Sequence, residues 1–178
     1  MGLHIRQVLS VILAAAATVV LAAAPAQAAP SRTTLQNAAS RVEYEDQGGP
    51  AYAYYHRKYP TQLNWTKDGC SVPAAMLSYR GLGAVLRNYS SVFRHSCDRH
   101  DFGYRNYGSN TSTPGRHPRF DPVQYRKDTI DKRFLVNMGI QCRKTYSAGS
   151  GRNACYVAAT IFYGAVNTTN AGHKAFFG

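Results

Sequence analysis

The chain has few acidic side chains, and it lacks the short motifs that mark several common enzyme classes. Its 178 residues include nine Asp and Glu against 21 Lys and Arg, which gives a formal net charge of +12. No G-x-S-x-G motif occurs, so a serine nucleophile elbow is not expected. The Gly-rich stretch 148–153 lacks the Lys-Ser/Thr ending of a phosphate-binding loop. Alternating strand-like runs are scarce as well, and the sequence therefore predicts a mainly helical protein.

The excess of positive charge favours an anionic partner. The basic residues are scattered along the chain, which argues against a disordered polybasic tail. Nucleic acid, anionic lipid and acidic polymers all attract a protein of this charge. Charge alone does not choose among these partners.

The first 28 residues have the pattern of a secretory signal peptide. Arg6 precedes an Ala-rich apolar run of about 17 residues, and the small residues Ala26 and Ala28 of the triplet AQA suit a signal peptidase. The apolar run is shorter than the roughly 20 residues of a membrane-spanning helix. We expect cleavage near Ala28, which leaves one domain's length of chain with a formal charge of +11, because only Arg6 is lost. Residues 29–50 are expected to form an N-terminal extension or a propeptide.

The cysteine count predicts disulfide bonds. Cys70, Cys97, Cys142 and Cys155 all follow the predicted leader. An even number of cysteines in an exported chain indicates two disulfides, and four cysteines allow three pairings.

Three later segments have the pattern of amphipathic helices. The first is expected over 91–107, with Ser90 as its cap. The second is expected to start at Asp121-Pro122 and to run to about residue 142, and the third covers 153–167. Apolar residues follow one side of the second and third segments: Ile130, Phe134 and Met138, then Ala154, Ala158, Ile161, Phe162 and Ala165.

The stretch CDRHDFGYRNYG (97–108) lies in the first of these segments and gathers its reactive side chains. Cys97, His100, Asp101 and Tyr104 are three or four residues apart, so they share one broad helical face. His100 and Asp101 nevertheless diverge by about 100° around the axis. They are therefore expected to serve two neighbouring sites, one built on an imidazole and one on a carboxylate.

Asp131 is the candidate partner of His100. If the first and second helices pack antiparallel, the helical rise places both residues at nearly the same level, about 10–13 Å from the connecting ends. A carboxylate beside the imidazole would fix its tautomer and stabilise the imidazolium. The alternative is a solvated edge on which Asp128 and Asp131 pair with Lys127 and Arg133. The spacing leaves both arrangements open.

Asp101 belongs with a second candidate site. If Cys70 bonds to Cys97, the loop 64–71 is held against the same helical face, and Asp68 comes near Asp101. Two carboxylates with loop carbonyls form an oxygen-rich site that suits Ca²⁺ rather than zinc. The alternative for Asp68-Gly69 is an ordinary turn.

Three segments together resemble the secreted phospholipases A2 of bacteria and fungi: CDRHDFGYRNYG, NWTKDGCS (64–71) and IDKRFLVNM (130–138). The resemblance covers roughly residues 60–178. It implies an all-α, disulfide-stabilised fold with an antiparallel pair of catalytic helices, here within a domain 51–178. It also implies the pairings Cys70–Cys97 and Cys142–Cys155. The interval between Cys70 and Cys97 is longer than in compact members of that family.

The same resemblance implies a site and a reaction. His100 would be the general base and Asp131 its orienting partner, while Asp68, Asp101 and the Gly69 carbonyl would bind Ca²⁺. The implied reaction is Ca²⁺-dependent hydrolysis of the sn-2 ester of glycerophospholipids by a water that His100 activates. Its products are a fatty acid and a lysophospholipid.

The expected partner is the surface of a phospholipid bilayer or micelle, to which a secreted monomer binds peripherally. Neither nucleic acid nor a protein partner is implied. Two other classes stay open on the charge and on the His beside a carboxylate: a secreted cationic nuclease, and a non-enzymatic module that binds membranes or the cell envelope.

Overall fold

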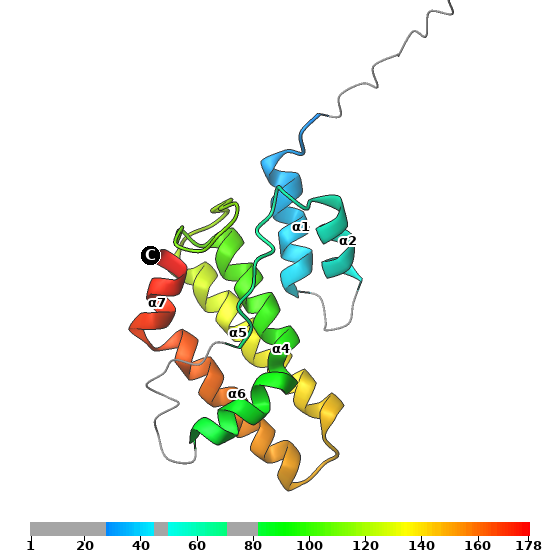
Figure 1. The fold of residues 1–178 in the computed structure, drawn as a ribbon, viewed down its shortest axis with the longest axis vertical. Coiled ribbons are helices and arrows are strands. Elements are labelled where there is room, and N and C mark those ends of the chain that lie inside the picture. The colour runs from blue at the N-terminus through cyan, green and yellow to red at the C-terminus, as the bar shows by residue number, and fades with distance from the viewer. Residues whose placement is uncertain (1–27, 45–49, 71–81) are drawn as a thin grey trace, which may run out of the picture.

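The computed structural model describes residues 28–44, 50–70 and 82–178, and all regular structure in these ranges is α-helical (Figure 1). The predicted leader lies outside them, apart from Ala28. Within this part of the chain, no helix is long and apolar enough to cross a membrane. The helices are α1 (Arg32–Tyr44), α2 (Ala51–Lys58), α4 (Leu82–Tyr107), α5 (Gln124–Thr145), α6 (Ser150–Asn167) and α7 (Asn170–Phe177).

Helices α4 and α5 form an antiparallel pair, with α6 packed against them (Figure 1). The ring of His100 on α4 lies 4.6 Å from the ring of Phe134 on α5, centroid to centroid. One turn later on α4, Tyr104 reaches back to Asp131 on α5. Residue numbers therefore increase along α4 in the direction in which they decrease along α5. The predicted all-α fold with an antiparallel helix pair is confirmed.

The start of α4 differs from the prediction. The helix begins at Leu82, well before the expected start at residue 91. Ser90 is not a cap: its hydroxyl donates to the Leu86 carbonyl at 2.8 Å, four residues back in the same helix. Serine can bond to a carbonyl within a helix as well as cap one, so its presence alone does not fix a helix start.

The start of α5 is also later than predicted. The helix begins at Gln124, after an extended Val123, and not at Asp121-Pro122. The Asp121 carboxylate instead accepts a hydrogen bond from Arg126 Nε at 3.0 Å. This carboxylate therefore makes an ion pair with the first turn of the helix.

The predicted apolar stripe of α5 is confirmed, because Ile130, Phe134 and Met138 are all buried. On α6 the prediction is wrong at Ala154, which is exposed, while its neighbour Cys155 is fully buried. The disulfide to α5 explains this difference, since it turns residue 155 toward the core.

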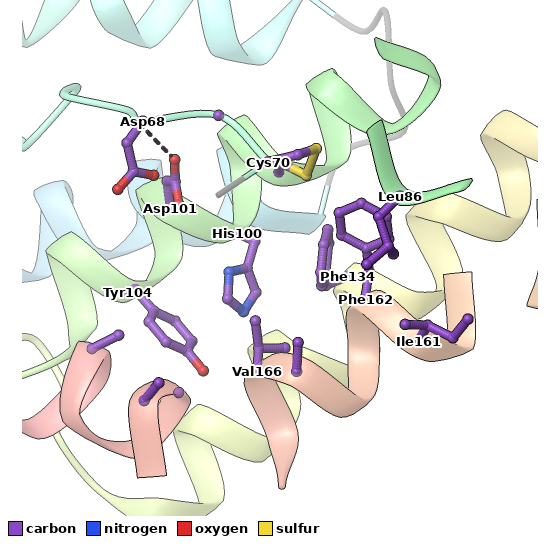
Figure 2. A pocket seen from close by; sticks show the side chains of 16 residues that line it. Asp68, Cys70, Leu86, His100, Asp101, Tyr104, Phe134, Ile161, Phe162 and Val166 are labelled. Carbon is purple, nitrogen blue, oxygen red and sulfur yellow. Dashed lines mark hydrogen bonds between the residues drawn. A yellow bond between two sulfur atoms is a disulfide. The ribbon is translucent and has the colours of Figure 1, made fainter. Parts of the chain in front are cut away.

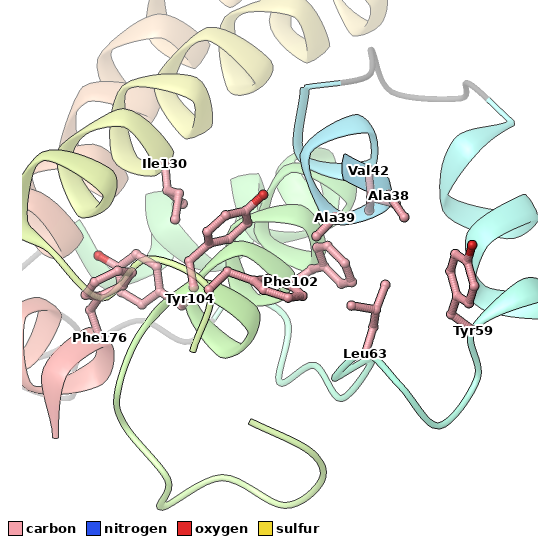
Figure 3. Packing of buried hydrophobic residues seen from close by; sticks show 11 residues of the cluster. Ala38, Ala39, Val42, Tyr59, Leu63, Phe102, Tyr104, Ile130 and Phe176 are labelled. Carbon is pink, nitrogen blue, oxygen red and sulfur yellow. The ribbon is translucent and has the colours of Figure 1, made fainter. Parts of the chain in front are cut away.

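Two apolar clusters make up the core. The first joins α1 and the loop before Asp68 to the end of α4 (Figure 3): Ala38, Ala39, Val42, Tyr59, Leu63, Phe102, Tyr104, Tyr107, Phe120, Ile130 and Phe176. The second joins α4, α5 and α6: Leu86, Phe93, Cys97, Phe134, Met138, Cys142, Cys155, Ala158, Ala159 and Phe162. Both predicted disulfides, Cys70–Cys97 and Cys142–Cys155, are present. Cys70 packs against the second cluster, and the other three cysteines belong to it.

Helix α1 lies in the segment predicted to be an extension or a propeptide. Its residues Ala39 and Val42 are completely buried. Arg99 on α4 donates to the Val42 carbonyl at 2.6 Å, and Arg32 donates to carbonyls of residues 118–120 at the other end of α1. The helix is thus part of the core, although cleavage in this segment stays a prediction.

Helix α7 was not predicted. Its cap is the hydroxyl of Thr169, which accepts from the Gly172 N–H at 3.1 Å. Its end is fixed by two backbone N–H groups, of Ser109 and Asn110, that donate to the Phe176 carbonyl. Its eight residues are too few for the helical period to stand out in a sequence.

Candidate active site

His100 and Asp131 lie within hydrogen-bonding distance in the interior of the protein. His100 Nε2 is 2.8 Å from Asp131 Oδ1, and Asp131 is fully buried. A carboxylate can only accept hydrogen bonds, so Nε2 carries the hydrogen. This arrangement leaves the lone pair of Nδ1 available to take a proton from another group.

Three donors hold the Asp131 carboxylate. The Tyr104 hydroxyl donates to Oδ1 at 2.8 Å, next to the imidazole, and the Lys127 ammonium donates to Oδ2 at 2.7 Å. Burial by itself would raise the pKa of Asp131, but the hydrogen bonds from His100, Lys127 and Tyr104 hold that pKa below its ordinary value. Asp131 is therefore an ionised carboxylate of fixed orientation.

The predicted alternative, a solvated edge around Asp131, is wrong. The pair of Lys127 with Asp131 exists, but both side chains are almost completely buried. Arg133 donates instead to the carbonyl of Tyr44 at the end of α1.

A cavity of about 320 Å³ opens beside His100 (Figure 2). The Asp68 and Asp101 carboxylates lie on one side of the imidazole, and Leu86, Phe134 and Phe162 lie on the other. The lining residues are Asp68, Gly69, Cys70, Leu86, Cys97, His100, Asp101, Tyr104, Phe134, Ile161, Phe162, Ala165, Val166, Ala171, Gly172 and Ala175. A mainly apolar wall thus faces a small polar end, as in a pocket for an amphipathic molecule.

The polar end is built by a loop against α4. The Asp68 backbone N–H donates to Asp101 Oδ2 at 3.0 Å (Figure 2). Gly69 follows with a φ of +72°, a backbone conformation that a residue with a side chain rarely adopts. The Cys70–Cys97 disulfide then fixes the end of the loop to α4. The two carboxylates predicted to lie together are therefore adjacent.

Arg105 lies beside both of these carboxylates. Its guanidinium is 3.3 Å from Asp68 Oδ2 and 3.4 Å from Asp101 Oδ2, and it also donates to the Thr66 carbonyl. Burial, then the neighbouring Asp68, raise the pKa of Asp101 to about 7, although Arg105 opposes this rise. A carboxylate with so high a pKa lacks sufficient positive charge around it when only protein groups are present.

The donor set at this end suits a hard cation. In the described part of the chain, no three His, Cys, Asp or Glu side chains gather in a group that could hold a metal ion. Asp68 and Asp101 supply two carboxylates, and Gly69, whose peptide carbonyl is the further predicted oxygen ligand, lines the same cavity. Calcium accepts such mixed oxygen ligands together with water.

Four of the five predicted site residues line the cavity: Asp68, Gly69, His100 and Asp101. The fifth, Asp131, lies behind His100. Tyr104 was expected on the helical face of His100 but without a role, and Arg105 was not predicted, although each lies four residues after a predicted site residue on the same helix. That spacing is the signal that could have identified them.

Comparison with known proteins agrees with this geometry. Residues 49–170 match the family described as prokaryotic phospholipase A2. The chain is also 29% identical over 145 residues to a protein of Beauveria bassiana (strain ARSEF 2860) named secretory phospholipase A2. The aligned stretch covers 81% of this chain and 63% of that relative, so the chain spans less than two thirds of the relative's length. Because the family match takes in well over half of the residues and all of α2, α4, α5 and α6, the chain belongs to the prokaryotic phospholipase A2 family.

Proposed function

We propose that the protein is a Ca²⁺-dependent phospholipase A2, which hydrolyses the sn-2 ester of glycerophospholipids to a free fatty acid and a lysophospholipid. One observation carries the proposal: the His100–Asp131 pair, 2.8 Å apart, lies at the junction between an apolar cavity wall and a pair of carboxylates. An ester between an acyl chain and a phosphorylated glycerol needs both surroundings at once.

His100 is the general base in this proposal. Its Nε2–H is held by Asp131, and Nδ1 takes a proton from a water molecule. The water oxygen bonds to the sn-2 carbonyl carbon, and the bond from that carbon to the glycerol oxygen then breaks. The imidazolium returns its proton to the leaving glycerol oxygen. Asp131 stabilises the imidazolium between these two transfers and stays ionised throughout.

The apolar wall binds the acyl chain in this proposal. Phe134, Phe162 and Ile161 line the cavity on the side away from the paired carboxylates. They exclude water from the ester, apart from the molecule that His100 activates.

Asp68, Asp101 and the Gly69 carbonyl are the proposed calcium ligands. The raised pKa of Asp101, which burial and Asp68 cause, supports a site that binds a cation. Bound Ca²⁺ would supply charge for the substrate phosphate and for the oxyanion that develops at the carbonyl.

Export and surface binding complete the proposal. The signal-like leader, the two disulfides and the secretory relative support a secreted enzyme. The formal charge of +11 after loss of the leader favours peripheral binding to anionic phospholipid surfaces.

The first test is fatty acid release from sn-2-labelled phosphatidylcholine, measured with Ca²⁺ and with excess EGTA. We expect release with Ca²⁺, and a loss of about 10²–10⁴-fold for His100→Gln, because general-base catalysis contributes that much. His95→Gln is the matched control, since His95 is exposed on the same helix. Release that survives EGTA or His100→Gln would contradict the proposal.

A further inference from the structure

Lys127 is a buried charge close to the proposed reaction centre. Only 1% of the residue is exposed, and its ammonium lies inside the protein between α5 and α6. Lysines are seldom fully buried, because removing an ammonium from water costs several kcal/mol. A buried ion pair often adds no stability over apolar residues of the same size. Stability therefore does not account for a lysine at this position.

The Lys127 ammonium contacts the His100–Asp131 pair, called the dyad below, and the cavity wall. Nζ donates to Asp131 Oδ2 at 2.7 Å and to the Val166 carbonyl at 2.8 Å. Its third side faces the ring of Tyr104, 5.7 Å from the centroid. An ammonium has three N–H groups, and the two hydrogen bonds use two of them. All three partners either hold His100 or line the cavity.

The two oxygens of Asp131 are thereby given separate tasks. Oδ1 accepts from His100 and Tyr104, and Oδ2 accepts from Lys127. With Oδ2 tied to an ammonium, the carboxylate cannot rotate to offer the imidazole a different geometry. Asp131 has two donors besides His100, the neutral Tyr104 hydroxyl and the charged Lys127 ammonium. The ammonium therefore keeps Asp131 ionised while the imidazole is neutral.

The Val166 contact fixes the ammonium from the opposite side. Val166 lies in the last turn of α6, where carbonyls have no partner within the helix and favour a cation. Helix α7 packs closely against the Val166 carbonyl, because a Cβ on Gly172 would lie 1.9 Å from the Val166 oxygen. Val166 and Gly172 both line the cavity. A chain of contacts thus runs from the cavity wall through Lys127 to Asp131.

We infer that Lys127 is a positioning residue of the active site, which acts through Asp131 and without touching substrate. The inference rests on the proposed function, since it assumes that His100 and Asp131 carry the reaction. In this inference, the buried Lys127 holds the Asp131 carboxylate in a fixed position relative to the cavity wall.

The test is a double-mutant cycle on kcat with a short-chain phosphatidylcholine kept monomeric. Lys127→Met, Asp131→Asn and the double variant are compared with the wild type. We expect Lys127→Met to lower kcat by about 10–100-fold, as loss of a residue that orients a catalytic group does. KM stays unchanged, because Lys127 does not line the cavity. In the Asp131→Asn background, the same substitution adds no further loss.

Lys132→Met is the matched control, because Lys132 is exposed on the same helix and its loss changes the net charge equally. A purely structural role for Lys127 would leave kcat intact or would give losses that multiply in the double variant, and either result overturns the inference. If Lys127→Met does not fold, Lys127→Gln takes its place in the same cycle, and a folded variant with unchanged kcat overturns the inference. A wild type that releases no fatty acid contradicts the proposed function instead.

Discussion

Two carboxylates on neighbouring helices, the buried Asp131 and the half-buried Asp101, differ in proton affinity because different groups surround them. Asp131 receives hydrogen bonds from a lysine, a tyrosine and a histidine, and these overcome the effect of burial, so its pKa is lowered. Asp101 is raised to a pKa of about 7 by burial and by Asp68, against a single arginine. The first arrangement suits a permanent anion beside a base, and the second suits a site that accepts a cation.

Another buried carboxyl, Glu43, takes part in neither site. It is 2% exposed at the end of α1, and neither of its oxygens has a hydrogen-bond partner within the described residues. Burial raises the pKa of Glu43 to about 7, although Arg126 and Arg133 oppose the rise. The folded protein therefore binds this proton more tightly than the unfolded chain does.

Glu43→Gln is expected to stabilise the protein at alkaline pH and to change its stability little at acidic pH. Because the folded pKa lies above the ordinary glutamate value of 4.5, Glu43 lowers the free energy of unfolding as pH rises from about 4.5 through 7. The shift corresponds to about 3 kcal/mol, present in full only above pH 7. Urea unfolding of both proteins at pH 4.5 and pH 8.5 measures the difference.

The difference between the two proteins cancels the titration of every other group. Asp128→Asn, which removes one negative charge from a less buried position, is the control for net charge. A stability difference that is equal at both pH values would contradict the assignment of a raised pKa to Glu43.

The sequence could bring His100 and Asp131 together, but it could not place Lys127. Helical rise puts the dyad residues at one level once the two helices are taken as antiparallel, and the contact at 2.8 Å agrees with that placement. The i, i+4 spacing of Lys127 and Asp131 is equally common on solvated helix faces. What buries the pair is the end of α6, and its Val166 carbonyl comes from 39 residues further along the chain.

At the scale of elements, α4 is the scaffold that both parts of the site share. It carries His100 and Tyr104 toward α5, and Asp101 and Arg105 toward the loop before Cys70. Residues four positions apart on a helix share a face, whereas adjacent residues point in different directions, so the two pairs face different neighbours. One rigid helix therefore fixes the distance between His100, the proposed base, and Asp101, a proposed calcium ligand.

Helix ends were the least predictable part of the fold. Serine, aspartate and proline mark where a helix can start, but α4 runs through Ser90, and α5 starts after Asp121-Pro122. In both cases a competing contact takes the side chain that would have capped the helix. Such contacts depend on neighbours that sequence periodicity does not describe.

Helix α1 allows a prediction about the N-terminal segment. Val42 is completely buried, so Val42→Ala is expected to lower the free energy of unfolding by about 2 kcal/mol, through lost burial and a small cavity. Arg41→Ala is the control, because Arg41 is exposed on the same helix and should change stability by less than about 0.5 kcal/mol. Urea unfolding measures both.

Equal stability of the two variants would show that α1 adds little to the folded core. The same result would favour removal of this segment as a propeptide. A loss confined to Val42→Ala would instead make the segment a permanent part of the domain (Figure 3).

At the scale of the whole molecule, the net charge and the candidate site depend on different sets of side chains. The His100–Asp131 pair is buried, whereas the formal charge of +11 after loss of the leader comes mainly from basic side chains spread over the chain. Buried pairs are screened little by salt, but exposed charges are screened strongly. Salt can therefore separate surface binding from chemistry.

Binding to anionic vesicles is expected to weaken steeply with salt, while hydrolysis of a monomeric short-chain phospholipid changes little. The Debye length falls from about 10 Å at 0.1 M to about 3 Å at 1 M, which removes the attraction of about 1 kcal/mol per basic residue near the surface. Co-sedimentation of His100→Gln with phosphatidylglycerol vesicles measures binding without hydrolysis, and phosphatidylcholine vesicles are the neutral control. Adsorption that is equal at both salt concentrations would mean that apolar contacts, and not the positive charge, hold the protein at the surface.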